Sequence, residues 1–323
     1  MPYISVIVTA YKRRQYLYNA LLSLKAQTLS RDKHEVIVVK DFEDHQIDNL
    51  IKDMGWKSVY SNEEYQGRMY LNGLKEANGD IITFLDDDDK YMPNRLEYVH
   101  NVFRQNPDIG YLQHSHIHLD TNGKAVYEFE KDASRNLVPQ SELKLTWNEI
   151  SRYREYGYLD PILLIFNRYR LHPDVNSTSI AVKRELLDRH KDLLNELPYE
   201  IDCFLFASAI ADRVSMFFSD AKLSSWTYHG SNFVSRLQLA NEGPEEIERF
   251  MKFNYYHYLS YTLISQKLLN YFPNFYACQA ERHKLLYLNT AKRFGKPAVS
   301  LTPDRNVITW CCNAGICPSE FQL

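Results

Sequence analysis

The sequence GDIITFLDDDD, at residues 79–89, joins a short apolar run to four consecutive carboxylates. Residues 81–85 are apolar or β-branched and follow a Gly-Asp turn, a pattern typical of a buried strand. In an open α/β sheet, ligands bind just beyond the carboxyl ends of the strands, where these acids fall. Side chains at i and i+2 of an extended segment point the same way, so Asp86 and Asp88 could share one ligand while Asp87 faces the other side. The stretch predicts a strand that ends in an acidic site.

Four adjacent carboxylates repel one another, and a bound cation would offset that repulsion. Mg²⁺ and Mn²⁺ are hard ions that take oxygen ligands and often bridge to substrate phosphates. A solvated acidic turn, or a helix N-terminus whose dipole favours acids, would explain the same residues without any ligand. The stretch by itself leaves both interpretations open.

The first 85 residues alternate between strand-like and helix-like patterns. Strands are predicted at residues 4–10, 35–39, 56–60 and 81–85, and helices at residues 12–27, 44–54 and 66–77. This alternation is typical of a parallel sheet with right-handed crossovers. The segment after the first strand lacks the Gly-rich loop of dinucleotide-binding and P-loop proteins. Phosphates must therefore be held in another way, for which a metal on the aspartates is the obvious candidate.

The rest of the chain mixes both patterns. Further strands are predicted at residues 109–119, 124–129, 176–182 and 215–218, and helices at residues 93–104, from 183 onward, at 204–211 and across 245–294. His114, His116 and His118 would share one strand face, which favours a polar or acceptor-facing surface over a metal site. The Tyr- and Arg-rich residues 143–172 are expected to form a helix and loop over a sugar or phosphate, although a single-stranded nucleic-acid groove has the same composition.

Bulk properties narrow the class of protein. The 323 residues allow one large domain or two smaller ones, and the net charge of −3 gives no reason to expect a nucleic-acid partner. The apolar run at residues 4–10 precedes a basic stretch, the reverse of a signal peptide, and residues 162–166 are too short to span a bilayer. Five cysteines in a chain of this length predict no disulfide framework and favour a cytoplasmic setting. Cys311, Cys312 and Cys317 are expected in a disordered or packed tail rather than in a metal or redox site.

The order of these features resembles family-2 glycosyltransferases of the GT-A fold. A first strand ending in Thr9-Ala10-Tyr11 is followed by a strand ending in Asp41, an Arg-bearing helix, and the acidic stretch. Residues 68–70 through 91–96 are particularly similar to the bacterial spore-coat polysaccharide members. The resemblance implies a mostly parallel central sheet flanked by helices. It divides the chain into a glycosyltransferase domain at 1–240 (nucleotide-sugar-binding half 1–105, acceptor half 106–240) and a C-terminal helical extension and tail at 241–323.

The resemblance also implies roles for single residues. The implied nucleotide-binding residues are Thr9, Ala10, Tyr11, Arg13, Asp41, Arg68, Asp86 and Asp87. The implied metal ligands are Asp86, Asp88 and His229, and the implied catalytic base is Asp202, with Glu200 as runner-up. The chain departs from the family pattern in three places: Lys40-Asp41 replaces a common Asp-Asp, Tyr70-Leu71-Asn72 replaces Ala-Arg-Asn, and the Arg often found before the late His is absent.

Together these expectations describe a metal-dependent, inverting glycosyltransferase that uses Mn²⁺ or Mg²⁺. It would move a sugar from a nucleoside-diphosphate sugar, with UDP-sugars favoured, to a hydroxyl of a glycan, a lipid or another acceptor. A sugar-phosphate nucleotidyltransferase and a non-catalytic nucleotide-sugar-binding protein are the alternatives; the first usually opens with a Gly-rich basic loop and the second would be expected to lack the base. Contact with the cytosolic membrane face and with a second copy of the chain stay open, and the Tyr-rich helices at 245–294 are expected to form an ordinary core face.

Overall fold

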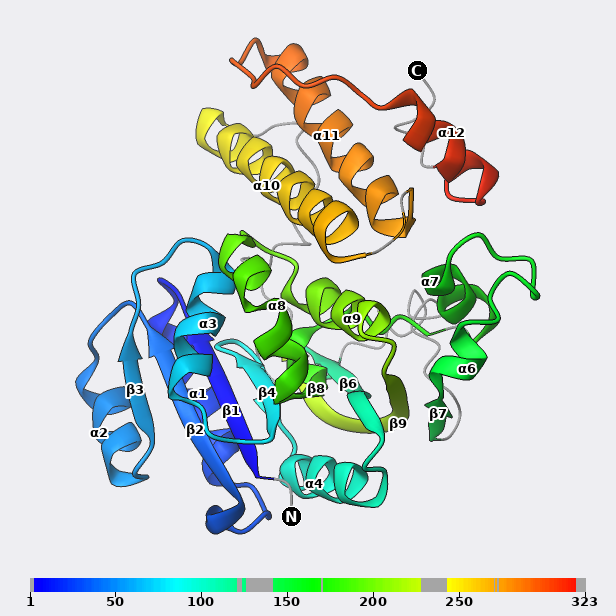
Figure 1. Ribbon diagram of the computed structural model, residues 1–323. Helices are drawn as coiled ribbons and strands as arrows, with labels where there is room; N and C mark the ends of the chain where they lie inside the picture. Colours follow the sequence, from blue (N-terminus) through cyan, green and yellow to red (C-terminus); the bar gives the residue numbers. More distant parts are fainter. Residues whose placement is uncertain are drawn as a thin grey trace.

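The computed structural model describes residues 3–120, 124–125, 142–169, 171–227, 243–269, 271 and 273–317. The strands are β1 (Ile4–Ala10), β2 (His34–Lys40), β3 (Lys57–Tyr60), β4 (Ile81–Asp86), β5 (Lys90–Tyr91), β6 (Ile109–Leu119), β7 (Leu143–Leu145), β8 (Ile180–Lys183) and β9 (Ser215–Thr227). Within these ranges the strands form one sheet in the order β3-β2-β1-β4-β8-β6-β9-β5, with β7 paired to β9 (Figure 1). The N-terminal strand is central, as its apolar sequence predicts.

The helices flank this sheet and extend beyond it. They are α1 (Arg14–Lys25), α2 (His45–Asp53), α3 (Gln66–Glu76), α4 (Arg95–Gln105), α6 (Trp147–Ile150), α7 (Pro161–Leu163), α8 (Arg184–Glu196), α9 (Ile201–Ala211), α10 (Pro244–Leu263), α11 (Phe275–Phe294) and α12 (Arg305–Asn313). Every element predicted before residue 105 is present, within a few residues of its expected bounds. The helices expected across 245–294 are present as α10, which continues into the π-helical turn η7 (Ile264–Leu268), and α11.

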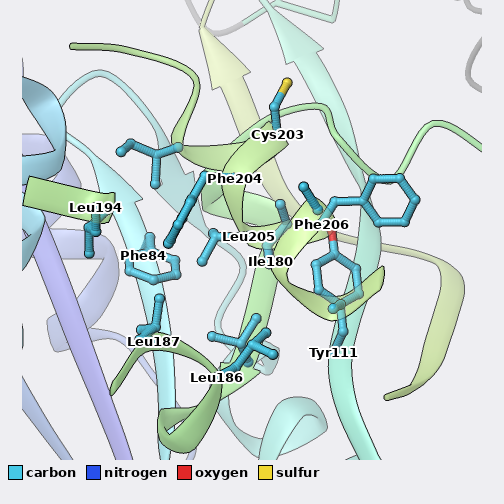
Figure 2. Packing of buried hydrophobic residues seen from close by; sticks show 14 of the residues in the cluster. Phe84, Tyr111, Ile180, Leu186, Leu187, Leu194, Cys203, Phe204, Leu205 and Phe206 are labelled. Carbon is cyan, nitrogen blue, oxygen red and sulfur yellow. The ribbon is translucent and has the colours of Figure 1, made fainter. Parts of the chain in front are cut away.

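Two cores lie on opposite faces of the sheet, because alternate residues of a strand point to opposite sides. Val6 and Val8 of β1 pack with α1, α2 and α4, whereas Ile7 packs with α3, α8 and α9. Figure 2 shows the core on the Ile7 side of the sheet, around Phe204, Leu205 and Phe206 of α9. Helix α9 has apolar residues almost all the way round, and nine of its eleven residues are buried. It is a core helix, and its N-terminus is thereby fixed next to the sheet edge.

The second half of the sheet differs from the sequence prediction. The strands from β3 to β4 are parallel, as is the long β6–β9 pair, whereas β8 pairs antiparallel with both β4 and β6, so the mostly parallel sheet contains one antiparallel strand near its middle. The strand predicted at 176–182 begins as a 3₁₀ turn, η4 (Ser177–Ser179), because Asn176 accepts a capping hydrogen bond from Thr178 N–H. The short strand predicted at 215–218 extends to Thr227 along β6. Most of the strand expected at 124–129 lies outside the described residues.

The histidines of β6 do not form a surface. His114 and His118 are buried, and the rings of His116 and His118 lie 4.8 Å apart beside Trp226. The prediction of an exposed polar face was therefore wrong for His114 and His118, because other side chains cover them: Arg95 of α4 contacts His114, and Trp226 of β9 packs against His118.

Helices α10, α11 and α12 pack together at one side of the sheet domain (Figure 1). Disulfides join Cys278 to Cys311 and Cys312 to Cys317, while Cys203 is a buried free thiol. The prediction that the cysteines form no disulfides was wrong, because the fold brings α12 back against α11, which spacing along the chain does not reveal. None of the described helices combines the length and apolar character needed to cross a bilayer. The boundary predicted at residue 240 lies outside the described residues and stays a prediction.

Candidate active site

The acidic residues after β4 lie at the carboxyl edge of the sheet, next to the end of β1, where Thr9 is in register with Asp86. We call Asp86, Asp87, Asp88 and Asp89 the aspartate cluster. Asp87 and Asp89 are buried, whereas Asp86 and Asp88 are partly exposed. The predicted extended geometry is not present, because β4 ends at Asp86 and a turn follows, in which Asp89 N–H donates to the Asp86 carbonyl at 3.1 Å. The carboxylates of Asp87 and Asp88 both contact the guanidinium of Arg13 instead of facing opposite sides.

Three groups from other elements hold Asp86 in place. The hydroxyl of Tyr70, on α3, donates to Asp86 Oδ1 at 2.9 Å, and the hydroxyl of Ser177 donates to Oδ2 at 3.0 Å. The backbone N–H of Asp86 in turn donates to Thr178 Oγ1 at 3.2 Å. Both oxygens of this carboxylate are oriented by neutral donors, so its charge is stabilised without being neutralised.

One cation lies in the aspartate cluster. The guanidinium of Arg13 pairs with Asp87 at 2.5 Å and with Asp88 at 2.7 Å. Burial raises the pKa of Asp86, Asp87 and Asp89, and the neighbouring carboxylate of Asp88 raises all three further. Four carboxylates around one guanidinium leave an excess of negative charge. The donor set is all oxygen, so the cluster fits a hard divalent cation beside Asp86 and Asp88.

The other nucleotide-binding candidates of the first half lie along the same edge. Ala10 of β1 is in register with Lys40, the last residue of β2, so Asp41 lies beside the segment that follows β1. The backbone N–H of Lys12 donates to Asp41 Oδ1 at 2.9 Å, and the Lys12 ammonium lies 4.8 Å from the centre of the Tyr11 ring. The structure thus brings Thr9, Ala10, Tyr11, Arg13 and Asp41 to one place, and their roles toward a nucleotide stay predictions.

Arg68 makes a different set of contacts. Its guanidinium donates to the carbonyl of Asn195 at 3.2 Å and to Glu63 at 3.3 Å, and it lies 4.7 Å from the centre of the Tyr65 ring. These contacts connect α3 to the end of α8. In this arrangement Arg68 is engaged with protein groups, and its predicted role at the phosphates stays a prediction.

Asn176 connects the aspartate cluster to the second acidic motif. Its side-chain amide donates to Asp89 Oδ2 at 3.2 Å, and its backbone N–H donates to Asp202 Oδ2 at 2.9 Å. Asp202 lies in the first turn of α9 and also accepts from Cys203 N–H at 2.9 Å. The two acidic groups, more than 100 residues apart in sequence, therefore lie on either side of one asparagine.

The two candidate bases have opposite environments. Burial raises the pKa of Asp202 well above its usual value, and Glu200 and Asp174 raise it further. Glu200 forms an ion pair with His257 of α10 and accepts from the Cys203 thiol at 2.9 Å. Although burial raises its pKa, the pairing with His257 lowers the pKa of Glu200 to about 2. Glu200 is consequently held as an ionised partner of His257, while Asp202 is the carboxylate with the greater affinity for a proton.

Backbone strain is concentrated around these residues. The described non-glycine residues with positive φ are Lys12, Asn176, Glu200 and Arg213. The first three adjoin Asp41, the aspartate cluster and Asp202, respectively. Such conformations cost roughly 1–3 kcal/mol each and persist where the surrounding contacts require them, which is most common at functional sites.

Arg95 is a buried residue that connects the elements carrying the site. This residue of α4 is fully buried, donates to His114 Nε2 at 2.8 Å and to Thr83 Oγ1 at 2.7 Å, and lies 3.8 Å from the centre of the Tyr91 ring. It also donates to the carbonyl of Thr178 at 2.9 Å. Burial, followed by the charge of Arg95, lowers the pKa of His114 well below its usual value, so His114 is neutral and accepts this hydrogen bond. Arg95 thus ties β4, β6 and the η4 turn together.

We expect Arg95→Met to lower the free energy of unfolding by roughly 3 kcal/mol, because several buried acceptors lose their donor at once and each unsatisfied group costs about 1–3 kcal/mol. Urea denaturation of the purified protein measures this. Arg104→Met, on the exposed face of the same helix, is the matched control and should change stability by less than about 0.5 kcal/mol. Equal effects from the two variants would contradict the structural role of Arg95.

Several site residues were not predicted from the sequence. Tyr70 was noted only as a departure from the family pattern, residues 177–179 were assigned to a strand, and His257 was given no role. The run Asn-Ser-Thr-Ser at 176–179 has the composition of a turn or helix cap, which was the available signal. The predicted ligand His229 lies outside the described residues.

The parallel β3-β2-β1-β4 half-sheet, with carboxylates at its carboxyl edge and helices on both faces, is the architecture of a GT-A-like fold. The chain belongs to the family described as Glycosyl transferase family 2, whose sequence model matches residues 5–171. The resemblance to that family is confirmed, whereas particular similarity to spore-coat members is not shown.

The chain matches only part of the length of its curated relatives. The chain is 30% identical over 129 residues to an uncharacterised glycosyltransferase from Nostoc, a match that covers 38% of this chain and 39% of the relative. It is 33% identical over 103 residues to the GalNAc(5)-diNAcBac-PP-undecaprenol beta-1,3-glucosyltransferase of Campylobacter jejuni, covering 30% of this chain and 33% of that protein. The matched segment therefore spans well under half of either relative.

Solved structures with the same fold cover most of the chain. TarS residues 1–349 from S. aureus, in complex with UDP-GlcNAc, superposes with a TM-score of 0.54 at 18% identity, covering 90% of this chain and 73% of that one. The mannosyltransferase PcManGT from Pyrobaculum calidifontis, in complex with GDP-Man and Mn²⁺, gives a TM-score of 0.53 at 12% identity, covering 99% and 82%. At these identities the comparison establishes the fold.

Proposed function

We propose that this chain is a metal-dependent, inverting glycosyltransferase that moves a sugar from a nucleoside-diphosphate sugar to an acceptor hydroxyl. The observation that carries the proposal is Asn176, whose two hydrogen bonds hold Asp89 of the aspartate cluster and Asp202 on either side of one short turn. A single displacement needs a site for the leaving diphosphate and a base for the incoming hydroxyl within one sugar's width of each other. Family membership supports the same reaction class.

The donor half of the site is the aspartate cluster and its neighbours. Asp86 and Asp88 are the residues that would hold the divalent cation, because they are the partly exposed members of the cluster. When bound, that cation supplies charge neutralisation to the departing diphosphate. Arg13 adds a positive charge that is already aimed into this edge. In this proposal Tyr11 and Asp41, which lie beside the end of β1, contact the base, and we favour uracil there.

The acceptor half is the N-terminus of α9. Asp202 takes the proton from the acceptor hydroxyl as that oxygen attacks the anomeric carbon, and the nucleoside diphosphate leaves from the opposite face, which inverts the configuration. The raised pKa of Asp202 suits this step, because a base with a pKa closer to neutrality holds the transferred proton better. Glu200, paired with His257, fixes the backbone that presents Asp202.

The acceptor is a glycan or a lipid-linked saccharide in this proposal. The name of the Campylobacter relative describes a lipid-linked glycan, and the names of the two solved neighbours include a UDP-linked and a GDP-linked sugar. A lipid-linked acceptor would require contact with a membrane surface. The preference for UDP or another nucleotide depends on the residues that contact the base. A binding experiment can measure this preference directly.

A thermal-shift panel of UDP, GDP, dTDP and CDP, each with Mn²⁺, with Mg²⁺ and with EDTA, tests the donor half. We expect one nucleotide to raise Tm with metal and to lose that effect in EDTA, because a ligand that binds only the folded state stabilises it. Stabilisation by UDP would support the favoured donor. Equal binding in metal and in EDTA would contradict the metal-dependent mechanism. The corresponding nucleoside triphosphates are measured alongside, and a response to them but to none of the diphosphates would favour the sugar-phosphate nucleotidyltransferase instead.

A further inference from the structure

A second candidate site lies in the C-terminal helices, away from the aspartate cluster. A pocket of about 390 Å³ opens between α10 with its π-helical continuation, α11, and the segment that leads into α12. Its volume falls in the range of ~300–1,000 Å³ typical of small-molecule sites. The Cys278–Cys311 disulfide fixes α12 against α11, so the third wall of the pocket is tied covalently to the second.

A buried ion pair forms part of the pocket lining. Lys284 pairs with Glu281 at 2.5 Å, with both side chains less than a tenth exposed. The Lys284 ammonium also donates to the carbonyl of Thr302 at 3.2 Å, and Glu281 accepts from the backbone N–H of Asp304 at 3.1 Å. The two charges offset each other, so the pocket offers fixed donors and acceptors without a strong net field.

One buried polar atom in the lining has no partner. Ser265 is 1% exposed, lines the pocket, and its hydroxyl has no hydrogen-bond partner among the described residues. Leaving a buried hydroxyl unpaired costs free energy, so a ligand or an ordered water that pairs with this group would be stabilised. Thr262, one helical turn before Ser265, and the ring of Tyr258 extend the same wall.

The chemistry of this lining favours one class of ligand. Hydroxyl, amide and paired charged groups predominate, whereas sites for apolar small molecules are lined mainly by hydrophobic side chains. Lys284 and Glu281 offset each other, and the other two charged lining residues, Asp304 and Arg305, also carry opposite charges, so the lining has no formal net charge to attract a phosphate or a metal ion. The lining combines an aromatic ring with hydrogen-bond donors and acceptors, which suits a neutral molecule with many hydroxyls. The apolar face of such a molecule can pack on the ring, and its hydroxyls can pair with the polar groups.

We propose that this pocket binds a neutral sugar residue outside the catalytic centre. The position of the pocket connects it to the candidate active site. Tyr258 lines the pocket, and the adjacent His257 pairs with Glu200 at the start of α9. Neighbouring residues of α10 therefore contact the start of α9 and line the pocket. Sugar binding itself needs neither donor nor turnover, so it can be tested independently of the proposed glycosyl transfer.

The test is isothermal titration of the full chain, without nucleotide, with chitobiose, lactose, cellobiose and maltose as probes and with inorganic phosphate as a charged comparison. We expect saturable binding of at least one disaccharide and none of phosphate. Thr262→Trp should abolish it by filling the pocket. Ser265→Ala should weaken it about tenfold through loss of one hydrogen bond, while leaving the Tm of the unliganded protein unchanged or slightly raised. Thr309→Trp, on the exposed face of α12, is the matched control and should bind normally.

Three results would overturn the proposal: no saturable binding of any disaccharide, binding that survives Thr262→Trp, or binding of phosphate in place of sugars. Because the nucleotide panel reads a different site, disaccharide binding can fail while metal-dependent nucleotide binding is retained, and the reverse outcome is equally visible. The nucleotide-dependent rise in Tm serves as the control for folding: a Thr262→Trp protein that is correctly folded should keep the wild-type rise.

Discussion

Replacing Asp202 with Asn is expected to lower kcat by about 10²–10⁴-fold with little change in donor binding, because general-base catalysis contributes an acceleration of that size. The asparagine keeps the size of the side chain and one acceptor oxygen for the hydrogen bond from Asn176 N–H. Steady-state kinetics of sugar transfer, together with the nucleotide-binding assay, separate the two effects. Loss of kcat with intact donor binding is the expected signature.

The pH profile gives an independent check on Asp202. Burial and the neighbouring acids raise its pKa, so the fraction of Asp202 in the carboxylate form increases as pH rises. kcat/KM of the wild-type protein should therefore rise with pH through this pKa, and that limb should disappear in Asp202→Asn. Asp212→Asn, at the other end of α9, is the matched control and should keep the wild-type profile.

Glu200→Gln distinguishes the two acids. We expect it to weaken the ion pair to His257 and to lower stability, while the pH limb of activity remains. If Glu200→Gln removes that limb and Asp202→Asn does not, Glu200 is the base and the assignment of the two roles is reversed.

Replacing Asp88 with Asn is expected to remove the metal-dependent part of nucleotide binding, with a loss of affinity of at least about 100-fold. Outer-shell partners of a metal site alone typically account for 10–100-fold, and a direct ligand contributes more. The variant also removes half of the carboxylate pair that binds Arg13, so the guanidinium remains with Asp87. Titration of the nucleotide that stabilises the wild-type protein, in Mn²⁺ and in EDTA, measures the change.

Asp80→Asn, an exposed acid just before the opposite end of β4, is the matched control for charge. It should bind the nucleotide as the wild-type protein does. An Asp88→Asn protein with full metal-dependent affinity would exclude Asp88 as a ligand and would leave Asp86 as the one candidate ligand among the partly exposed members of the aspartate cluster.

The first half of the fold and its acidic edge were predictable from the sequence. Strands β1, β2 and β4 are continuous apolar runs buried on both faces, and the helices between them have clear 3.6-residue periodicity. These signals are local. The position of the aspartate cluster followed from them, since the carboxyl ends of parallel strands meet at one edge of the sheet.

The partners of these acids were not predictable in the same way. Ser177 is 91 residues from Asp86, and the His257 that holds Glu200 lies on a helix added after the sheet domain. No periodic pattern marks such pairs. The pairing of Cys278 with Cys311 likewise depended on α12 packing against α11.

The sequence by itself determined the class of fold, the edge of the sheet that carries the acids and the identity of the acids at both motifs, because strand burial and helical period are properties of neighbouring residues. The tertiary structure alone decided which acid is held and which can accept a proton. Asp202 and Glu200 are two residues apart and alike in intrinsic chemistry. Their environments separate their pKa values in opposite directions, because only folding places His257 against Glu200 and leaves Asp202 among other carboxylates.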